Sequence, residues 1–150
     1  MAGATGDEIV HGIDFLTGIL VDARAQLKVV DTHVGLNDFE AAGKKLDNSI
    51  KAALASGTVD SVMATKINQG LMQAERNWLN PDGIPGRPWF KHILYGARFT
   101  YAHLELPGLT EAVEKADWTT ARQQAAILQR AIANNTQLMN SLNAELAGKN

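Results

Sequence analysis

The chain has 150 residues, no cysteine and a formal net charge of -2, with 45% hydrophobic and 20% charged residues. This length suits one domain with a sizeable core, and the composition lacks the low hydrophobicity and high charge of disordered chains. The charge balance argues against a nucleic-acid partner, and the lack of cysteine excludes disulfides, thiolate zinc sites and a cysteine nucleophile.

The first predicted helix covers residues 9–34. Its apolar side chains recur at intervals of four and three residues, which places them on one helical face. These positions are Ile9, Ile13, Leu16, Leu20, Ala23, Leu27, Val30 and Val34. Thr5 and Glu8 have the spacing of a capping box before this helix, and Gly35 offers a stop. Residues 1–6 are expected to be flexible or vector-derived.

A second helix is predicted to begin at Asn37, which forms a capping-box pattern with Glu40, and to end at Gly57. Its inward positions are Phe39, Ala42, Leu46, Ile50 and Ala53. The pattern therefore predicts a second amphipathic helix after a short turn.

Thr58 or Asp60 is predicted to start a third helix. It should end at Asn80, because Pro81 disfavours the α conformation of the residue before it. Its inward positions are Val59, Met63, Ile67, Leu71, Ala74 and Trp78. Gly70 inside this helix costs about 1 kcal/mol relative to alanine, so we expect close packing against a neighbour there.

A short helix is expected over residues 110–116, and Asp117 is predicted to cap a final long helix. The inward positions of the long helix are Ala121, Ala125, Leu128, Ile132, Asn135, Met139, Leu142 and Leu146. Asn135 interrupts this apolar face, either as a register device or as a hydrogen-bonded edge residue. Together the elements predict an all-α fold, an up-down four-helix bundle with a long proline- and aromatic-rich loop between the third and fourth long helices.

The segment 80–106 departs from this helical pattern, because helix connections in bundles usually have about 2–8 residues. Its prolines, aromatic residues and basic residues are Pro81, Pro85, Pro88, Trp89, Phe90, Tyr95, Phe99, Tyr101, Arg87, Lys91, His92, Arg98 and His103. We expect so aromatic a loop to be ordered. It would either fold over the bundle as a structural plug or serve as a contact surface for another domain.

Residues that suit catalysis or metal binding are few. The histidines form no HExxH motif and no pair at i, i+4, and no glycine-rich phosphate loop is present; they are His11, His33, His92 and His103. No apolar run reaches the roughly 20 residues that span a bilayer. The residues alone leave three hypotheses: an assembly module, a standalone ligand-binding bundle with the aromatic loop as a lid, and a metallo-bundle that uses His92 and His103.

Residues 75–95 read ERNWLNPDGIPGRPWFKHILY. This stretch resembles the C-terminal dimerisation domain of the glutamate carboxypeptidase and transferrin receptor family. There, a helix ends in an E-R-x-aromatic-aliphatic-x-P-x-G-aliphatic-P-x-R-P motif, which is followed by two aromatics and a basic-His-aliphatic-aliphatic-Tyr run. Leu106-Pro107-Gly108 and the helix over 118–146 match as well, so the resemblance covers at least residues 39–146.

The resemblance implies a helical domain that forms homodimers, in a parent chain whose protease-like and apical domains lie elsewhere. The proline-rich loop would pack on the protease-like domain. The residues expected at the domain or dimer interface are Arg87, Trp89, Phe90, His92, Tyr95 and Phe99. Tyr101 takes the position of a tyrosine that family peptidases bring to the substrate pocket, and Thr100 takes the position of their lysine.

The resemblance also bears on cofactors and partners. The pair of zinc ions of family peptidases is held by the protease-like domain, so we expect no cofactor and no catalytic residue in this chain. The expected partners are a second copy of the chain and the protease-like domain, without nucleic acid and without direct membrane insertion.

Overall fold

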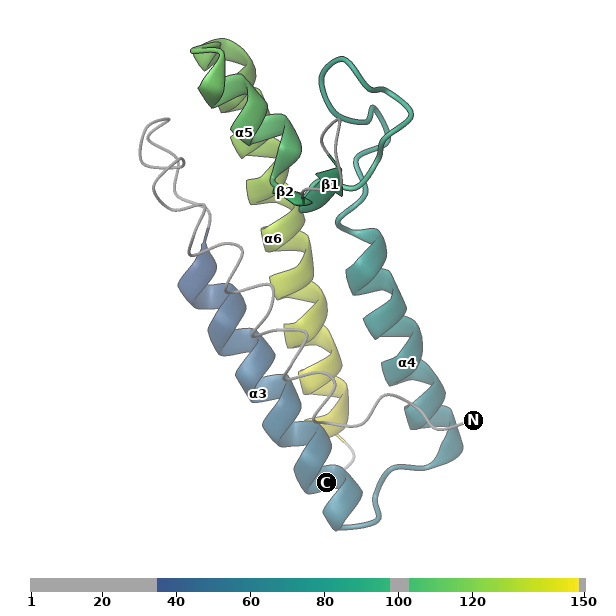
Figure 1. Cartoon of the computed structure of the whole chain (residues 1–150). Coiled ribbons are helices and arrows are strands. Elements are labelled where there is room, and N and C mark those ends of the chain that lie inside the picture. Colours follow the sequence, from purple (N-terminus) through teal and green to yellow (C-terminus); the bar gives the residue numbers. More distant parts are fainter. Residues whose placement is uncertain (1–34, 98–102, 149–150) are drawn as a thin grey trace.

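The computed structural model describes residues 35–97 and 103–148 (Figure 1). The helix predicted over residues 9–34 lies outside the described residues, as do His11 and His33. The elements in chain order are α3 (Leu36–Ala55), α4 (Ser61–Arg76), β1 (Tyr95–Ala97), β2 (His103–Glu105), α5 (Pro107–Glu114) and α6 (Trp118–Ala147).

Helix α3 begins two residues before the position that the capping-box pattern indicates. Gly35 is the N-cap, in the left-handed conformation with φ 66°, and no side chain caps the helix. The prediction that Asn37 caps this helix is therefore wrong, because the glycine already turns the chain into the helix at Leu36. All of the predicted inward positions are buried: Phe39, Ala42, Leu46, Ile50 and Ala53.

Helix α4 begins as predicted, since the Asp60 carboxylate accepts a hydrogen bond from the Met63 amide at 2.7 Å. It ends at Arg76, before the predicted end at Asn80. Trp78 is buried beyond that end and meets the Phe39 ring edge to face, with centroids 6.0 Å apart. The aromatic pair therefore closes the space between the start of α3 and the end of α4.

Close packing at Gly70 is confirmed. A Cβ placed on Gly70 would lie 2.6 Å from Cδ1 of Leu142, far inside van der Waals contact. The glycine therefore lets the α4 backbone approach α6 at a distance that a side chain would prevent.

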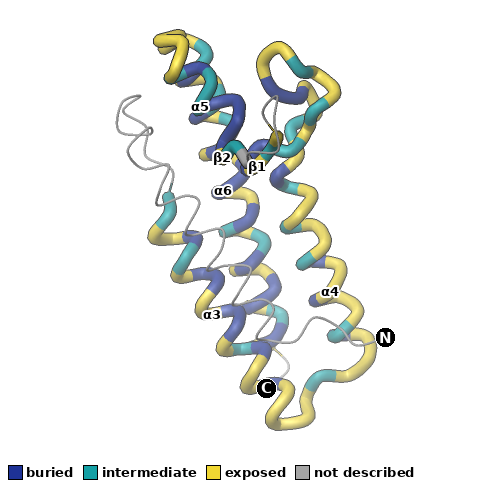
Figure 2. Tube along the Cα trace, viewed as in Figure 1, coloured by how far each residue is buried: buried dark blue, intermediate teal, exposed yellow. Residues whose placement is uncertain are grey.

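Helix α6 is the common partner of the other described helices, because α3, α4 and α5 all pack against it. Asp117 caps it as predicted, accepting hydrogen bonds from the Thr120 amide at 3.0 Å and the Thr120 hydroxyl at 2.6 Å. Each predicted inward position of α6 is buried: Ala121, Ala125, Leu128, Ile132, Asn135, Met139, Leu142 and Leu146. Figure 2 shows this buried line along α6, whereas α4 is exposed over most of its surface.

The described part of the fold is mostly helical, and its long helices alternate in direction. α3 and α6 run the same way and α4 runs oppositely (Figure 1). The short helix predicted over 110–116 is present as α5, three residues earlier at its start. A two-stranded antiparallel sheet, β1 with β2, is an addition that the sequence did not predict. The complete four-helix bundle stays a prediction, since it includes residues 9–34.

Candidate functional site

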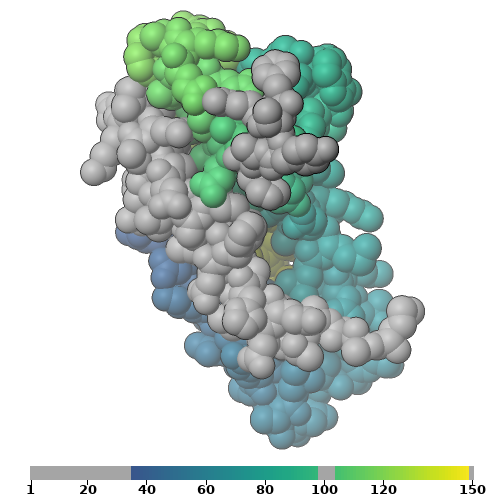
Figure 3. Space-filling model, in the orientation of Figure 1, coloured from purple at the N-terminus to yellow at the C-terminus, as the bar shows by residue number. Residues whose placement is uncertain are grey.

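The loop after α4 is closed on itself by backbone hydrogen bonds. The Asn80 amide donates to the Lys91 carbonyl at 2.8 Å, and the Ile93 amide donates to the Trp78 carbonyl at 3.0 Å. The beginning and the end of the loop, residues 78–80 and 91–93, therefore lie side by side at the end of α4. The described part of the loop projects at the same end of the molecule as α5 (Figure 3).

Inside this loop, a tight turn fixes the proline-rich part. Gly83 has φ 73°, and a Cβ there would lie 2.5 Å from the Pro88 carbonyl oxygen. The Asn80 side chain donates to the Gly83 carbonyl at 2.6 Å. The Lys91 ammonium donates to the Pro88 carbonyl at 2.5 Å and also to the Pro81 carbonyl. Prolines have no backbone N–H, so this segment has few backbone donors. Lys91 therefore donates to carbonyl groups of the loop in their place.

The second half of the predicted loop is a β-hairpin. Tyr95 pairs with Glu105, and Ala97 pairs with His103. The Leu106 amide donates to the Leu94 carbonyl at 2.7 Å and extends the pairing by one step. Phe99, Thr100 and Tyr101, three of the residues singled out by the resemblance, belong to the connection 98–102, which lies outside the described residues.

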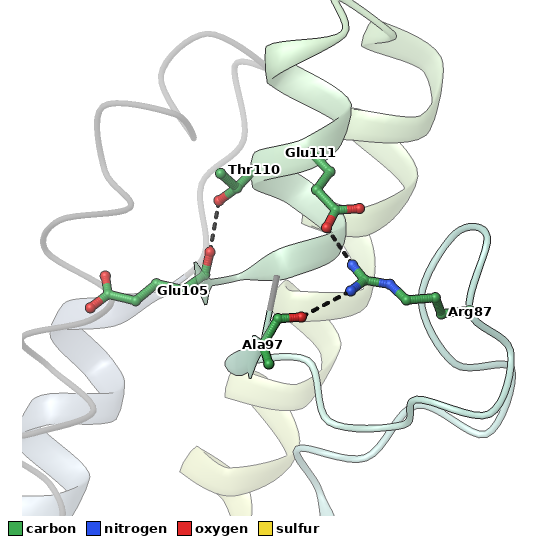
Figure 4. A network of polar contacts seen from close by, with 5 residues as sticks. All are labelled: Arg87, Ala97, Glu105, Thr110 and Glu111. Carbon is green, nitrogen blue, oxygen red and sulfur yellow. Dashed lines mark hydrogen bonds and ion pairs between the residues drawn. The ribbon is translucent and has the colours of Figure 1, made fainter. Parts of the chain in front are cut away.

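Arg87 joins the loop, the hairpin and α5 (Figure 4). Its Nη1 donates to the Ala97 carbonyl at 3.2 Å, and its Nη2 forms an ion pair with the Glu111 carboxylate. The two charged side chains are 25% and 21% exposed, so the pair is partly shielded from water. Thr110, the neighbour of Glu111, donates its hydroxyl to the Glu105 carbonyl at 2.7 Å. Both strands of the hairpin are therefore tied to α5.

His92 is half-buried and held from two sides. Its Nδ1 accepts a hydrogen bond from the Leu94 amide at 3.3 Å, which places the proton of the neutral ring on Nε2. Nε2 lies 3.4 Å from the Glu75 carboxylate. The centroid of the His92 ring lies 4.0 Å from that of the Tyr95 ring, and the two rings are tilted by 36°. His92 thus links the end of α4 to the first strand of the hairpin.

The predicted interface residues divide into two groups. Trp89 and Tyr95 are 73% and 44% exposed, so they present apolar surface to the outside. Phe90 is half-buried and turns inward, since its ring lies 3.0 Å from where a Cβ of Gly96 would be. Arg87 is committed to contacts within the domain. One part of this segment thus packs within the domain, and another part is exposed at its surface.

The described residues contain no group of three or more histidine, aspartate and glutamate side chains that could hold a metal ion. His92 and His103, the pair of the metallo-bundle hypothesis, lie on the loop and in β2. Among the described helices, none is both long and apolar enough to cross a bilayer.

The structure also has a groove away from the described part of the aromatic loop. This groove has a volume of about 620 Å³ and lies between the start of α3 and α6, with Gly35, Asp38, Ile132, Thr136 and Asn140 among its lining residues. None of its lining residues belongs to 80–97 or 103–106, the described parts of the predicted loop.

The sequence did not indicate the contacts that Glu111, Thr110 and Lys91 make. Glu111 lies 24 residues from Arg87 along the chain, and no spacing rule connects them. Lys91 was noted as a base of the loop, but its role as a donor to proline carbonyls depends on the turn at Gly83. The proline content was the available signal, because prolines leave neighbouring carbonyls to be paired by side chains.

Comparison with known proteins supports the resemblance in the loop and the last helix. The family model described as "Transferrin receptor-like dimerisation domain" matches residues 27–140. A probable glutamate carboxypeptidase of Arabidopsis thaliana is 28% identical over 135 residues, which is 84% of this chain and 17% of that protein. A probable glutamate carboxypeptidase of Zea mays is 34% identical over 68 residues, 44% of this chain and 10% of that protein.

A third relative is an inactive zinc metalloprotease of Schizosaccharomyces pombe. It is 33% identical over 58 residues, 38% of this chain and 7% of that protein. The chain thus spans less than a fifth of the length of each of these relatives.

Proposed function

The chain belongs to the transferrin receptor-like dimerisation domain family, and on that premise we propose that it is an assembly domain of a glutamate carboxypeptidase-like protein. It forms a homodimer and contributes part of a substrate-pocket wall, and it has no peptidase activity by itself. The observation that carries this proposal is the exposed aromatic surface of Trp89 and Tyr95 on a loop that is otherwise closed by internal hydrogen bonds.

An exposed tryptophan on a fixed loop suits a contact with another folded surface. Trp89 is 73% exposed and Leu79, beside the same loop, is 47% exposed. Aromatic side chains with few rotatable bonds lose little entropy when they become buried in an interface, which is why they are enriched there. The proposed occupant of this surface is the protease-like domain of the parent protein. The connection 98–102, with Thr100 and Tyr101, would then lie at the substrate pocket.

A different surface suits the contact with a second copy. Helix α4 buries Met63, Ile67 and Gly70 toward the bundle, while Val62 and Met72 on its outward side are 71% and 57% exposed. In a two-fold pair of antiparallel α4 helices that cross on the outward face, at the level along the axis midway between residues 62 and 72, Val62 of one copy would lie opposite Met72 of the other. An interface of this kind is self-complementary, as a two-fold contact requires.

Sedimentation equilibrium of the chain tests the dimer. We expect a concentration-dependent dimer that Val62→Asp and Met72→Asp each weaken, because a carboxylate in an apolar contact must be desolvated. Lys45→Asp, on the exposed side of α3, is the control and should leave the dimer intact. A monomer at every concentration, or equal effects of all three variants, would contradict the assignment of α4.

The inert character of the chain is tested separately. The purified chain, supplied with zinc and a peptide ending in glutamate, should release no glutamate above the buffer rate. The complete parent protein with Trp89→Ala should lose activity or its docked arrangement, while the same substitution should leave the folding of the isolated chain unchanged.

A further inference from the structure

We infer that Arg87 and Glu111 are positioning residues that fix the direction in which the hairpin β1–β2 leaves the bundle. Given the proposed function, they would thereby set where the hairpin β1–β2 meets the protease-like domain. The first statement concerns this chain alone. The second rests on the proposed function.

The first step is the geometry of Arg87. One guanidinium reaches the Ala97 carbonyl, at the end of β1, and the Glu111 carboxylate on α5 (Figure 4). A planar guanidinium has several donors in a fixed arrangement, so it can hold two acceptors from different elements at once. A lysine ammonium at this position would be a compact charge on a flexible side chain. It would not hold the Ala97 carbonyl and the Glu111 carboxylate in a fixed arrangement.

The second step is the weakness of the hairpin itself. β1 and β2 have three residues each, and Gly96 contributes no side chain to the sheet. Isolated two-stranded hairpins are marginally stable in water, so this one needs contacts from outside. On β1 the contact comes from Arg87. On β2 it comes from Thr110, whose hydroxyl donates to the Glu105 carbonyl.

The third step is that α5 is itself immobilised on the core. Helix α5 packs on α6, and the side-chain amide of Gln124 on α6 lies where a Cβ on Gly108 would be. Leu109 and Ala112 are buried on the same helix. Contacts therefore run without a break from α6 through α5 and Glu111 to Arg87 and the end of β1. The hairpin takes its direction from the bundle by this route.

Hydrogen exchange measured by mass spectrometry on the chain tests the inference. In Arg87→Ala and Glu111→Gln, the amides of 95–97 and 103–106 should exchange roughly ten- to a hundredfold faster, because a charge-assisted hydrogen bond is lost. Exchange in α3, α4 and α6 should stay unchanged, which shows that the variants fold. Arg130→Ala, an exposed arginine of α6, is the matched control and should have no effect on the hairpin.

Two further variants separate the ion pair from the contact with Ala97. Arg87→Lys keeps the charge next to Glu111 but should still loosen β1. The exchanged pair Arg87→Glu with Glu111→Arg restores an ion pair yet leaves no donor for the Ala97 carbonyl, so its hairpin should exchange as fast as that of Arg87→Ala. Unchanged hairpin exchange in Arg87→Ala, or full recovery in the exchanged pair, would overturn the positioning role.

In the complete parent protein, the same variants should raise KM severalfold more than they lower kcat, with the dimer unaffected. A loosened hairpin with an unchanged KM would overturn the link to the substrate pocket and leave the positioning of the hairpin standing. Loss of the dimer in these variants would instead count against the separation of the two surfaces.

Discussion

The side-chain oxygen of Asn135 on α6 accepts a hydrogen bond from the Asn77 side-chain amide at 2.7 Å, just past the end of α4. The side-chain Nδ2 of Asn135 in turn donates to the Ala74 carbonyl at 3.2 Å. Asn135 is 1% exposed, so this polar group is fully inside the packed part of the molecule. The structure therefore shows a hydrogen-bonded asparagine that joins two helices, and it fixes the end of α4 against the middle of α6.

Replacing Asn135 by leucine should destabilise the chain by about 1–3 kcal/mol, because the Ala74 carbonyl and the side-chain amide of Asn77 lose their hydrogen-bond partner. Urea unfolding followed by circular dichroism measures the effect. Asn134→Leu, on the exposed neighbouring position, should change the free energy of unfolding by less than about 0.5 kcal/mol. Equal effects of the two substitutions would show that the buried contact contributes nothing.

Gly70→Ala should be destabilising although alanine is the better helix former. The intrinsic gain is about 1 kcal/mol, whereas crowding a packed core costs typically about 1–3 kcal/mol. The added methyl meets Leu142, so Leu142→Ala in the same chain should relieve the clash. The double variant should then be less unstable than the sum of the single effects. Strict additivity would exclude this contact as the cause.

The tryptophans at positions 78 and 89 should behave in opposite ways. Trp78 is 1% exposed and Trp89 is 73% exposed. Trp78→Ala should cost about 3–5 kcal/mol of unfolding free energy, as large-to-small core substitutions do. Trp89→Ala should stay within about 0.5 kcal/mol of the unsubstituted chain. Acrylamide quenching gives an independent measure: quenching should fall in Trp89→Ala, where Trp118 at 41% exposure is the remaining accessible tryptophan, and should rise in Trp78→Ala, which lacks the buried one.

The cap of α6 should make stability depend on acidity. Hydrogen bonds from the Thr120 hydroxyl and amide hold the pKa of Asp117 below its ordinary value of 3.8, with a smaller contribution from the charge of Lys115. A lowered pKa in the folded state means that the stabilisation is present above pH 3.8 and is lost as the pH falls through the folded pKa.

Asp117→Asn keeps a capping side chain without the charge. The Tm of the unsubstituted chain should exceed that of Asp117→Asn by a few degrees at neutral pH, and this difference should shrink as the solution is acidified below pH 3.8. Asp82→Asn, in the exposed part of the loop, is the control. A Tm difference that stays constant from neutral to acidic pH would contradict a charge effect.

The helices were predictable because each one repeats an apolar spacing over many turns. The faces of α3 and α6 follow that spacing, and their buried residues agree with it one by one. The start of α3 was not predictable from capping patterns. Asn37 and Glu40 have the right spacing, but the chain enters the helix earlier through the left-handed Gly35.

The site was predictable in location and not in internal structure. Prolines and aromatics marked the loop, yet strands of three residues, one with a central glycine, carry no readable alternation. The Arg87–Glu111 pair depends on how the chain enters α5 at Leu106 and how it turns from α5 to α6 at Ala116, and both residues have positive φ. Such non-glycine conformations are uncommon and are imposed by the surrounding packing.

The role of α6 as common partner has a consequence for synthesis on the ribosome. α3 and α4 emerge well before α6, and at about 5–20 residues per second the delay is on the order of several seconds. During this time Phe39, Leu46 and Ile67 have no α6 to cover them. We therefore expect nascent chains that end before α6 to be bound by chaperones and digested readily by protease, and the described helices to acquire protection together once α6 is free of the exit tunnel.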